Sequence, residues 1–179
     1  MKNKQDADAQ PREAFLDIET TGLSPYQCDI SVVGILTRGA YIGLVSGFDL
    51  TPEALCYVLK DVDILYTFNG RRFDIPFVRK KMEMDLEEGK AHIDVLYQCR
   101  SVGLRGGQKI VERTLCLSRS QECPDGRAAA RLGKRWLKHG DLGALEILMR
   151  YNEDDLRNLQ KIKEHVERCK NSGETAKDR

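Results

Sequence analysis

The sequence predicts an α/β domain in which a mixed β-sheet is covered on its faces by helices. Two observations carry this prediction. Apolar segments suited to strands dominate the first half of the chain, and helical patterns dominate the second half. Segments with helical signals also separate the later strands, as crossover connections do. A chain of 179 residues suits one domain and can bury a sizeable core.

The chain opens with a polar stretch that is followed by three strands. Residues 1–13 are polar and aperiodic, which predicts a flexible N-terminal arm. The first strand follows directly, as the apolar run from Phe15. Residues 30–36 and 41–48 are rich in Ile, Val and Leu. They are separated by Arg38-Gly39-Ala40, so we expect a β-hairpin there.

The middle of the chain alternates helices and strands. Thr51 before a proline is typical of a helix N-cap, so a helix is expected over about residues 52–60. The apolar run 63–68 predicts a fourth, buried strand. The next helix should begin around Asp74, because a proline two residues later fits only the first turn. Residues 92–97 suit a short fifth strand or a strand-to-helix passage.

Helical patterns continue from Gly106 to near the end of the chain. Loops are expected near residues 118–124 and at Gly140. The longest helix is predicted over about residues 143–169, and the polar residues 170–179 are expected to be flexible. The predicted organisation is an arm, a domain and a tail, at residues 1–13, 14–169 and 170–179.

The first strand carries two acids within its apolar run. Alternate residues of a strand point to opposite faces, so Asp17 and Glu19 project together, away from Leu16 and Ile18. Neighbouring carboxylates repel each other, and a hard divalent cation removes that conflict. The turn Thr20-Thr21-Gly22 leaves the acids at a strand end, where α/β proteins commonly bind ligands. An edge strand whose acids deter pairing is the alternative.

The last helix adds a second group of polar residues beside an apolar stripe. The stripe consists of Leu145, Leu148, Met149, Leu156, Leu159, Ile162 and Val166. Tyr151 and Asp155, four residues apart, lie together at its margin. Glu153 and Asp154 are expected to point to solvent, and Asn152 lies within the stripe. Asp155 is therefore the acid that can face the inside of the domain, although a packed tyrosine beside a solvated acid is the alternative.

Three segments in order carry a resemblance to a known family. The Asp17-Ile18-Glu19 strand, the segment Asn69-Gly-Arg-Arg-Phe-Asp74 and the Tyr151-x-x-x-Asp155 helix resemble the three exonuclease motifs of the DEDD superfamily. The tyrosine four residues before the last acid matches the DEDDy subgroup. The arrangement, over about residues 14–168, is similar to the proofreading exonuclease domain of family B DNA polymerases. The resemblance implies a ribonuclease-H-like fold, a mixed five-stranded sheet with one antiparallel strand, which agrees with the hairpin.

These motifs contain four acids that together would form an oxygen cage suited to Mg²⁺ or Mn²⁺. The four are Asp17, Glu19, Asp74 and Asp155. The resemblance implies a 3′–5′ exonuclease that acts on the 3′ end of single-stranded DNA or RNA and releases nucleoside monophosphates. It assigns Asp17, Glu19 and Asp155 to one cation, with Asp17 bridging, and Asp74 to supporting a second. Two such ions would stabilise the attacking and leaving oxygens of an in-line displacement at phosphorus. The resemblance also implies that Tyr151 orients the attacking water. A phenol with a pKa of about 10 is not the main base at neutral pH, so the metal must lower the pKa of the water.

Candidate nucleic-acid contacts lie in two places. The predicted helix over residues 127–138 has basic side chains of a single sign on one face, which can follow phosphates, although an ordinary solvated face is the alternative. These side chains are Arg127, Arg131, Lys134, Arg135 and Lys138. Arg71 and Arg72 could contact a phosphate or merely screen the acids. Thr20 and Asn69, beside the acids, complete the candidate set.

Two other features have simple structural explanations as well as functional ones. Gly106-Gly107-Gln108-Lys109 is a candidate phosphate loop, but a hinge before a helix explains it equally well. Asp94 follows an apolar pair and could support the acids from behind, but we expect it to be a helix N-cap.

Composition narrows the chemistry further. The three histidines are scattered and the six cysteines contain no C-x-x-C pair, so any metal should be held by oxygen and free thiols are expected. No apolar run approaches a membrane span and no signal-peptide pattern precedes the first strand, so we expect a cytoplasmic protein without a membrane partner. The net charge of +1 neither favours nor excludes nucleic acid.

Two other functions remain open on the sequence. A ribonuclease-H-like endonuclease would use similar acids, but the spacing of Tyr151 and Asp155 favours an exonuclease. A binding module that keeps the fold without turnover is the second alternative. The presence of all four acids argues against it.

Overall fold

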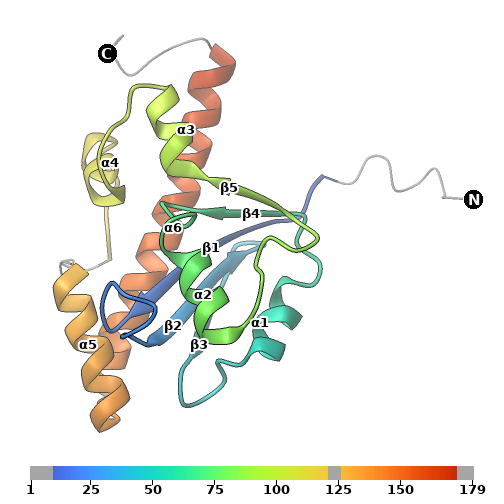
Figure 1. Cartoon of the computed structure of the whole chain (residues 1–179). Helices are drawn as coiled ribbons and strands as arrows, with labels where there is room; N and C mark the ends of the chain where they lie inside the picture. Colours follow the sequence, from blue (N-terminus) through green and yellow to red (C-terminus); the bar gives the residue numbers. More distant parts are fainter. Residues whose placement is uncertain (1–9, 121–125, 173–179) are drawn as a thin grey trace, which may run out of the picture.

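A five-stranded sheet lies between two layers of helices (Figure 1). The computed structural model describes residues 10–120 and 126–172. The strand order is β3-β2-β1-β4-β5. The predicted mixed sheet flanked by helices is confirmed. The outer parts of the predicted arm and tail, residues 1–9 and 173–179, lie outside the described residues.

The central strand β1 (Glu13–Thr20) has neighbours of opposite direction. It pairs antiparallel with β2 (Ile30–Thr37) and parallel with β4 (Ile64–Thr67). β3 (Ala40–Val45) pairs antiparallel with β2, and β5 (Ala91–Asp94) pairs parallel with β4. β2 is therefore the single strand that runs against the others, as the hairpin predicts.

The predicted strand 41–48 is too long at its C-terminal end. β3 ends at Val45, because the main-chain N–H groups of Phe48 and Asp49 turn back to the Val45 carbonyl. Phe48 is apolar for a different reason: its ring packs at a tilt of 39° against Trp136, with the ring centroids 5.0 Å apart.

Helices α1 (Pro52–Leu59) and α2 (Asp74–Met82) cover one face of the sheet. The Thr51 hydroxyl accepts a hydrogen bond from the Ala54 N–H, so the predicted N-cap is confirmed. α2 begins at Asp74, as the position of the proline requires. Side chains from both helices pack against the β1 residues that face away from the acids, Ala14, Leu16 and Ile18.

The other face is covered by α3 (Val95–Ser101), α4 (Gln108–Thr114), α5 (Gly126–His139) and α6 (Leu142–Ser172). α6 crosses the sheet, and the predicted apolar stripe supplies much of the core on this side. α5 packs beside α6 over β1 and β2 (Figure 1). None of the described helices is long and apolar enough to cross a membrane.

Candidate metal centre

Three carboxylates converge on the face of the sheet that α6 covers. Asp17 and Glu19 project from β1, and Asp155 projects from α6. One carboxylate oxygen from each residue lies within 4.8 Å of the other two. Glu19 and Asp155 are buried and Asp17 is half-buried. The period of the strand and the phase of the helix therefore bring these three predicted residues together.

Asn152 holds the carboxylate of Asp17. Its Nδ2 donates to Asp17 Oδ2 at 2.8 Å, and its Oδ1 accepts from the Tyr41 hydroxyl at 3.0 Å. Asn152 is fully buried in the apolar stripe of α6. The stripe predicted its burial, but neither its contact with Asp17 nor the role of Tyr41 was predicted, because both depend on how α6 docks on the sheet.

Gly34 makes this docking possible. It lies opposite Asp17 in the β1–β2 register. A Cβ atom at this position would overlap the Asn152 carboxamide and lie 2.8 Å from Leu156 Cδ1. Because Gly34 has no side chain, α6 can approach β2 closely enough for Asn152 to reach Asp17.

Asp74 lies beside the cluster but is not one of its three members. β4 pairs with β1 only as far as Phe15. Beyond that point Asp74 replaces β4 as a partner of β1, since its Oδ1 accepts from the Ile18 N–H at 3.1 Å. Burial raises the pKa of Asp74 to about 7, against main-chain hydrogen bonds that lower it. A metal-binding role for Asp74 stays a prediction.

The electrostatics of the three clustered acids fit a divalent cation. Burial raises the pKa of Asp17, Glu19 and Asp155, and neighbouring carboxylates raise the pKa of Asp17 and Glu19 further. Arg119 opposes this effect at Asp155. Glu19 Oε1 is buried and has no hydrogen-bond partner among the described residues. An all-oxygen donor set with one buried oxygen unpartnered suits a hard ion such as Mg²⁺.

The raised pKa of Asp74 predicts how the metal-free protein responds to pH. An acid with a higher pKa in the folded state ionises first in the unfolded state, so its contribution to stability is lost as pH rises. We expect the free energy of unfolding of Asp74→Asn, minus that of the natural chain, to increase steadily from about pH 4 to about pH 7. Denaturant unfolding across this range, without divalent cations, measures the difference. A difference that is independent of pH would contradict the assignment.

Tyr151 lies one helical turn before Asp155 and is buried. Lys109 Nζ lies 4.3 Å from the centroid of its ring, and the Arg119 guanidinium carbon lies 5.5 Å from it. Lys109 belongs to the candidate phosphate loop, whose glycines precede the short helix α4. The sequence patterns did not identify Arg119, because it lies in a predicted loop without periodicity.

A cavity of about 290 Å³ opens onto these acids. Its walls come from the end of β1, the turn after it, Phe73 before α2, and the N-terminal part of α5. The lining residues are Asp17, Ile18, Glu19, Thr20, Gly22, Leu23, Phe73, Gly126, Ala129, Ala130, Tyr151 and Asp155. The acids therefore face an accessible pocket whose remaining wall is mostly apolar.

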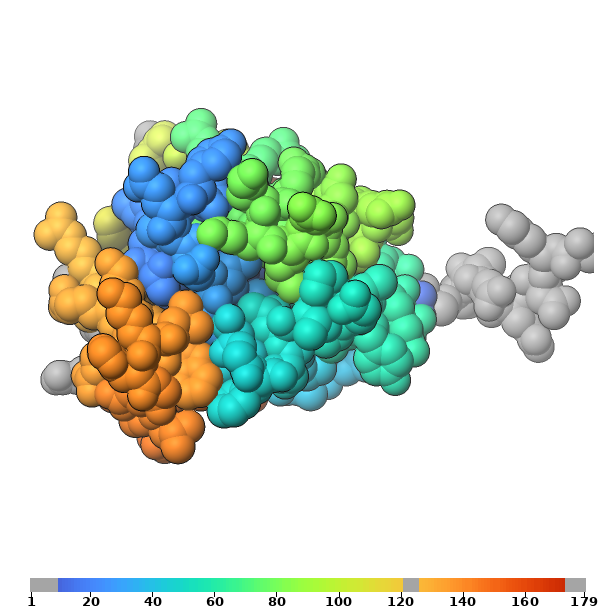
Figure 2. All heavy atoms as spheres, turned by 60° about the horizontal axis from the view of Figure 1, so that its bottom comes forward, coloured from blue at the N-terminus to red at the C-terminus, as the bar shows by residue number. Residues whose placement is uncertain are grey.

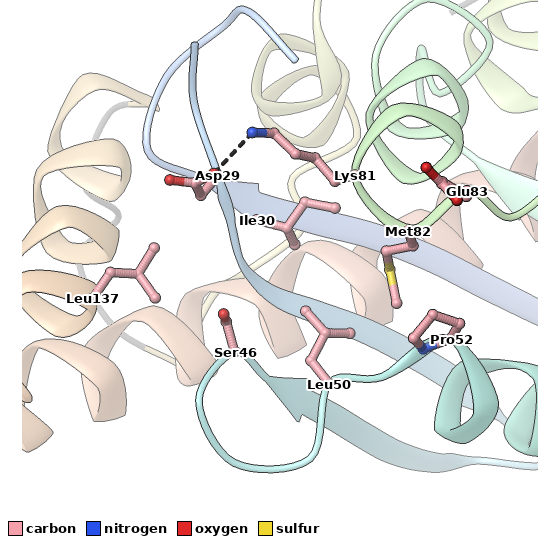
Figure 3. Close-up of a pocket in the computed structure, with 9 residues that line it drawn as sticks. All are labelled: Asp29, Ile30, Ser46, Leu50, Pro52, Lys81, Met82, Glu83 and Leu137. Atoms are coloured by element: carbon pink, nitrogen blue, oxygen red, sulfur yellow. Dashed lines mark hydrogen bonds and ion pairs between the residues drawn. The ribbon is translucent and has the colours of Figure 1, made fainter. Parts of the chain in front are cut away.

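A larger groove of about 610 Å³ lies elsewhere, between the C-terminal end of α2, the segment after β3, and α5 (Figure 3). It includes the ion pair of Asp29 and Lys81, whose atoms are 2.8 Å apart, and the apolar Leu50, Met82 and Leu137. None of the three clustered acids lines it. Size alone therefore does not mark the functional site in this fold.

The segment from Asn69 to Asp74 is bonded through its main chain to the Asp94 side chain. The Asp94 carboxylate accepts from the main-chain N–H groups of Asn69 at 2.8 Å and Arg71 at 3.2 Å. It also accepts from the Leu96 N–H, so the predicted N-cap of α3 is confirmed. The side chains of Arg71 and Arg72 are exposed, and neither residue lines the cavity at the acids. The Thr20 hydroxyl donates to the Gly22 carbonyl at 2.7 Å, within the turn after β1.

α5 lies at an edge of the molecule (Figure 2), and its basic residues are exposed. Arg135 is ion-paired with Asp141, with atoms 2.6 Å apart. For the other four cations the described residues provide no ion pair. These are Arg127, Arg131, Lys134 and Lys138. Because Gly126 and Ala130 line the acidic cavity, the basic face of α5 begins beside the site.

The helical phase predicted that Asp154 points to solvent, and this prediction is only partly right. It is half-buried, and its Oδ2 accepts from the N–H of Ser120 at 3.0 Å and from the hydroxyl of the same residue at 2.9 Å. The reason is that the segment after α4 folds back onto α6, which a helical wheel alone does not reveal.

The sheet order, the flanking helices and the acid cluster define a ribonuclease-H-like α/β protein with a carboxylate site. A model of the RNase_H superfamily matches residues 14–167, and the chain belongs to that superfamily. No curated protein sequence matches the chain.

Solved structures share the fold at low sequence identity. The family B DNA polymerase from the hyperthermophilic archaeon Pyrobaculum calidifontis matches with a TM-score of 0.68 and 16% identity over 88% of this chain. The match spans only 25% of the polymerase chain. NrnC from Brucella melitensis matches with a TM-score of 0.61 and 20% identity, over 99% of this chain and 82% of NrnC. The predicted likeness to a family B polymerase is thus confirmed at the level of the fold.

Proposed function

We propose that the protein is a divalent-metal-dependent 3′–5′ exonuclease that releases nucleoside monophosphates from the end of a DNA or RNA strand. The observation that carries the proposal is the convergence of Asp17, Glu19 and Asp155 within 4.8 Å, beside Tyr151, in an accessible cavity. Acids this close and this buried repel one another, and a cation-dependent reaction on phosphate accounts for their placement.

Asp17, Glu19 and Asp155 would hold one Mg²⁺ or Mn²⁺ ion, and Asp74 would support a second. The Asp74 carboxylate keeps lone pairs for this beyond its bond to the Ile18 N–H. Bound cations would stabilise the charge that develops on the phosphate and lower the pKa of the attacking water. Asn152 fixes the orientation of Asp17 through its bond to Oδ2. Tyr151 would orient the water, since it lines the same cavity as the three acids.

The cavity favours a strand end over the middle of a strand. Its volume of about 290 Å³ is at the lower limit of small-molecule sites, so it suits one terminal nucleotide. It is bounded by the turn after β1 on one side and α5 on another. An endonuclease would need room for the strand on both sides of the cleaved bond.

Neighbouring structures support a nucleic-acid substrate. Brucella melitensis NrnC has been solved bound to pGG, with 18% identity to this chain, and with bound Mg²⁺, with 20% identity. We also propose a cytoplasmic location, since the five cysteines that the structure describes are free thiols, which fits a reducing compartment.

The basic face of α5 would carry the strand upstream of the 3′ end. The double variant Arg131→Gln/Lys134→Gln should weaken binding of a single strand to the metal-free protein. Because each phosphate contact contributes about −0.7 to the slope of log affinity against log salt, the slope should become shallower by about 1.4. Fluorescence anisotropy at several salt concentrations measures it. Arg135→Gln is the matched control, since its charge is already paired with Asp141. An equal slope for the double variant and the natural chain would contradict this role.

Hydrolysis assays test the proposal directly. A 3′-labelled single strand, the same strand with a blocked 3′ end and a circular strand are incubated with Mn²⁺, each as RNA and as DNA. We expect labelled monophosphates from the open strand alone. Cutting of the circle would favour the endonuclease, and binding without any product would favour the binding module. The comparison of RNA with DNA identifies the sugar.

A further inference from the structure

A buried ion pair of Arg119 and Glu112 contacts the Asp155 carboxylate. Neither residue of this pair belongs to the three motifs. The Arg119 guanidinium contacts Glu112 twice, through Nε to Oε2 and Nη2 to Oε1, each at 2.7 Å. The same Nη2 donates to Asp155 Oδ1. The Arg119 and Asp155 side chains are each 11% exposed, and the Glu112 side chain is 4% exposed. A cation is therefore fixed between one acid of the cluster and one acid outside it.

The segment that carries Arg119 is tied to α6 on both sides of this contact. The Ser118 carbonyl accepts from Asn158 Nδ2 at 3.2 Å, and Ser120 donates to Asp154. From α4, Gln108 Nε2 donates to the Asp155 carbonyl at 2.7 Å and to Glu112 Oε1 at 3.1 Å. These bonds place the guanidinium against Asp155 independently of any ligand.

We propose that Arg119, anchored by Glu112, is a positioning residue that fixes the carboxylate of Asp155 for binding a divalent cation. The inference rests on the proposed metal site. The guanidinium fork is bidentate to Glu112, so the group that contacts Asp155 is held more rigidly than a flexible ammonium group would be. The contact to one oxygen leaves lone pairs of the carboxylate available to a metal. Partners of metal ligands typically change metal affinity or activity by about 10–100-fold when they are replaced.

Charge balance distinguishes this role from that of a temporary counter-ion. A cation that merely substitutes for the metal would have to leave Asp155 when the metal arrives. Arg119 has its own counter-ion, since its Nε contacts Glu112 without involving the nitrogen that donates to Asp155. The pair of Glu112 and Arg119 carries no net charge, so it can remain in place without repelling a divalent cation.

Calorimetric titration of the metal-stripped full chain with Mn²⁺, without nucleic acid, tests the proposal. Arg119→Lys keeps the charge and loses the fork, and Arg119→Gln loses both. We expect each variant to weaken Mn²⁺ binding by about tenfold or more. Arg157→Gln is the matched control, because it removes the same charge from the exposed side of α6, where Arg157 pairs with Glu153. It should change Mn²⁺ affinity by less than about twofold.

Glu112→Gln provides a second variant if Arg119→Gln fails to fold, and it should weaken Mn²⁺ binding in the same direction. Tighter binding by Arg119→Gln would identify Arg119 as a competitor of the metal and overturn the proposal, as would unchanged affinity in both Arg119 variants. Absence of Mn²⁺ binding by the natural chain would overturn the metal site itself. The titration contains no nucleic acid, so its result does not depend on hydrolysis. A protein that binds Mn²⁺ as expected here, but hydrolyses no strand in the separate assay, would refute only the exonuclease proposal.

Discussion

Asp155→Asn is expected to abolish hydrolysis while leaving the fold intact. Asp155 is one of the three acids whose oxygens lie within 4.8 Å of one another, and a neutral amide cannot supply the missing negative charge. Because replacing mere partners of metal ligands costs about 10–100-fold, replacing the ligand itself should cost more than about a hundredfold in kcat. Asparagine keeps the shape of the side chain, and Arg119 keeps Glu112 as its counter-ion.

Asp154→Asn is the matched control in the same turn of α6. Asp154 accepts hydrogen bonds from Ser120, and an asparagine retains an acceptor oxygen for them. We expect a loss of stability of about 1 kcal/mol or less and hydrolysis within about threefold of the natural chain. Rates on a 3′-labelled strand, with thermal denaturation of each variant, provide the comparison. Equal damage from both substitutions would show that the assigned orientation of α6 is wrong.

Local patterns predicted most of the elements and the face on which each clustered acid lies, but not how α6 docks against β1. The alternation in β1 placed Asp17 and Glu19 on one face, and the helical phase of α6 chose Asp155 over Asp154. The cap at Thr51 and the start of α2 at Asp74 follow from short-range backbone chemistry. Such features depend on neighbours within one turn or one strand, which a sequence displays directly.

Residues that support the acids could not be predicted in the same way. Asn152 and Asp17 are 135 positions apart, and their contact depends on the docking of α6. Arg119 lies in an irregular segment, so no periodicity indicates where its side chain points. Gly34 looks like an ordinary strand glycine until the position of α6 is known. In each case the information lies in tertiary geometry.

Gly34→Ala should damage both stability and activity. A Cβ at Gly34 would overlap the Asn152 carboxamide and lie 2.8 Å from Leu156 Cδ1, so α6 would have to shift away from the sheet. Insertion of a methyl group into a packed core typically costs about 1–3 kcal/mol, and we expect the upper part of that range. The shift would also break the bond from Asn152 to Asp17 and loosen the acid cluster. Denaturant unfolding and the rate of strand hydrolysis measure the two effects.

A double variant separates the two effects of Gly34→Ala. Adding Asn152→Ala removes the overlapping carboxamide, so part of the lost stability should return, with a coupling energy of at least about 0.5 kcal/mol. Hydrolysis should stay low, because Asp17 then lacks its amide donor. Gly143→Ala, in the first turn of α6, is the control, since the nearest atom to a Cβ built there is Asp141 Oδ1 at 3.4 Å. Recovery of full activity in the double variant would show that Asn152 fills space without orienting Asp17.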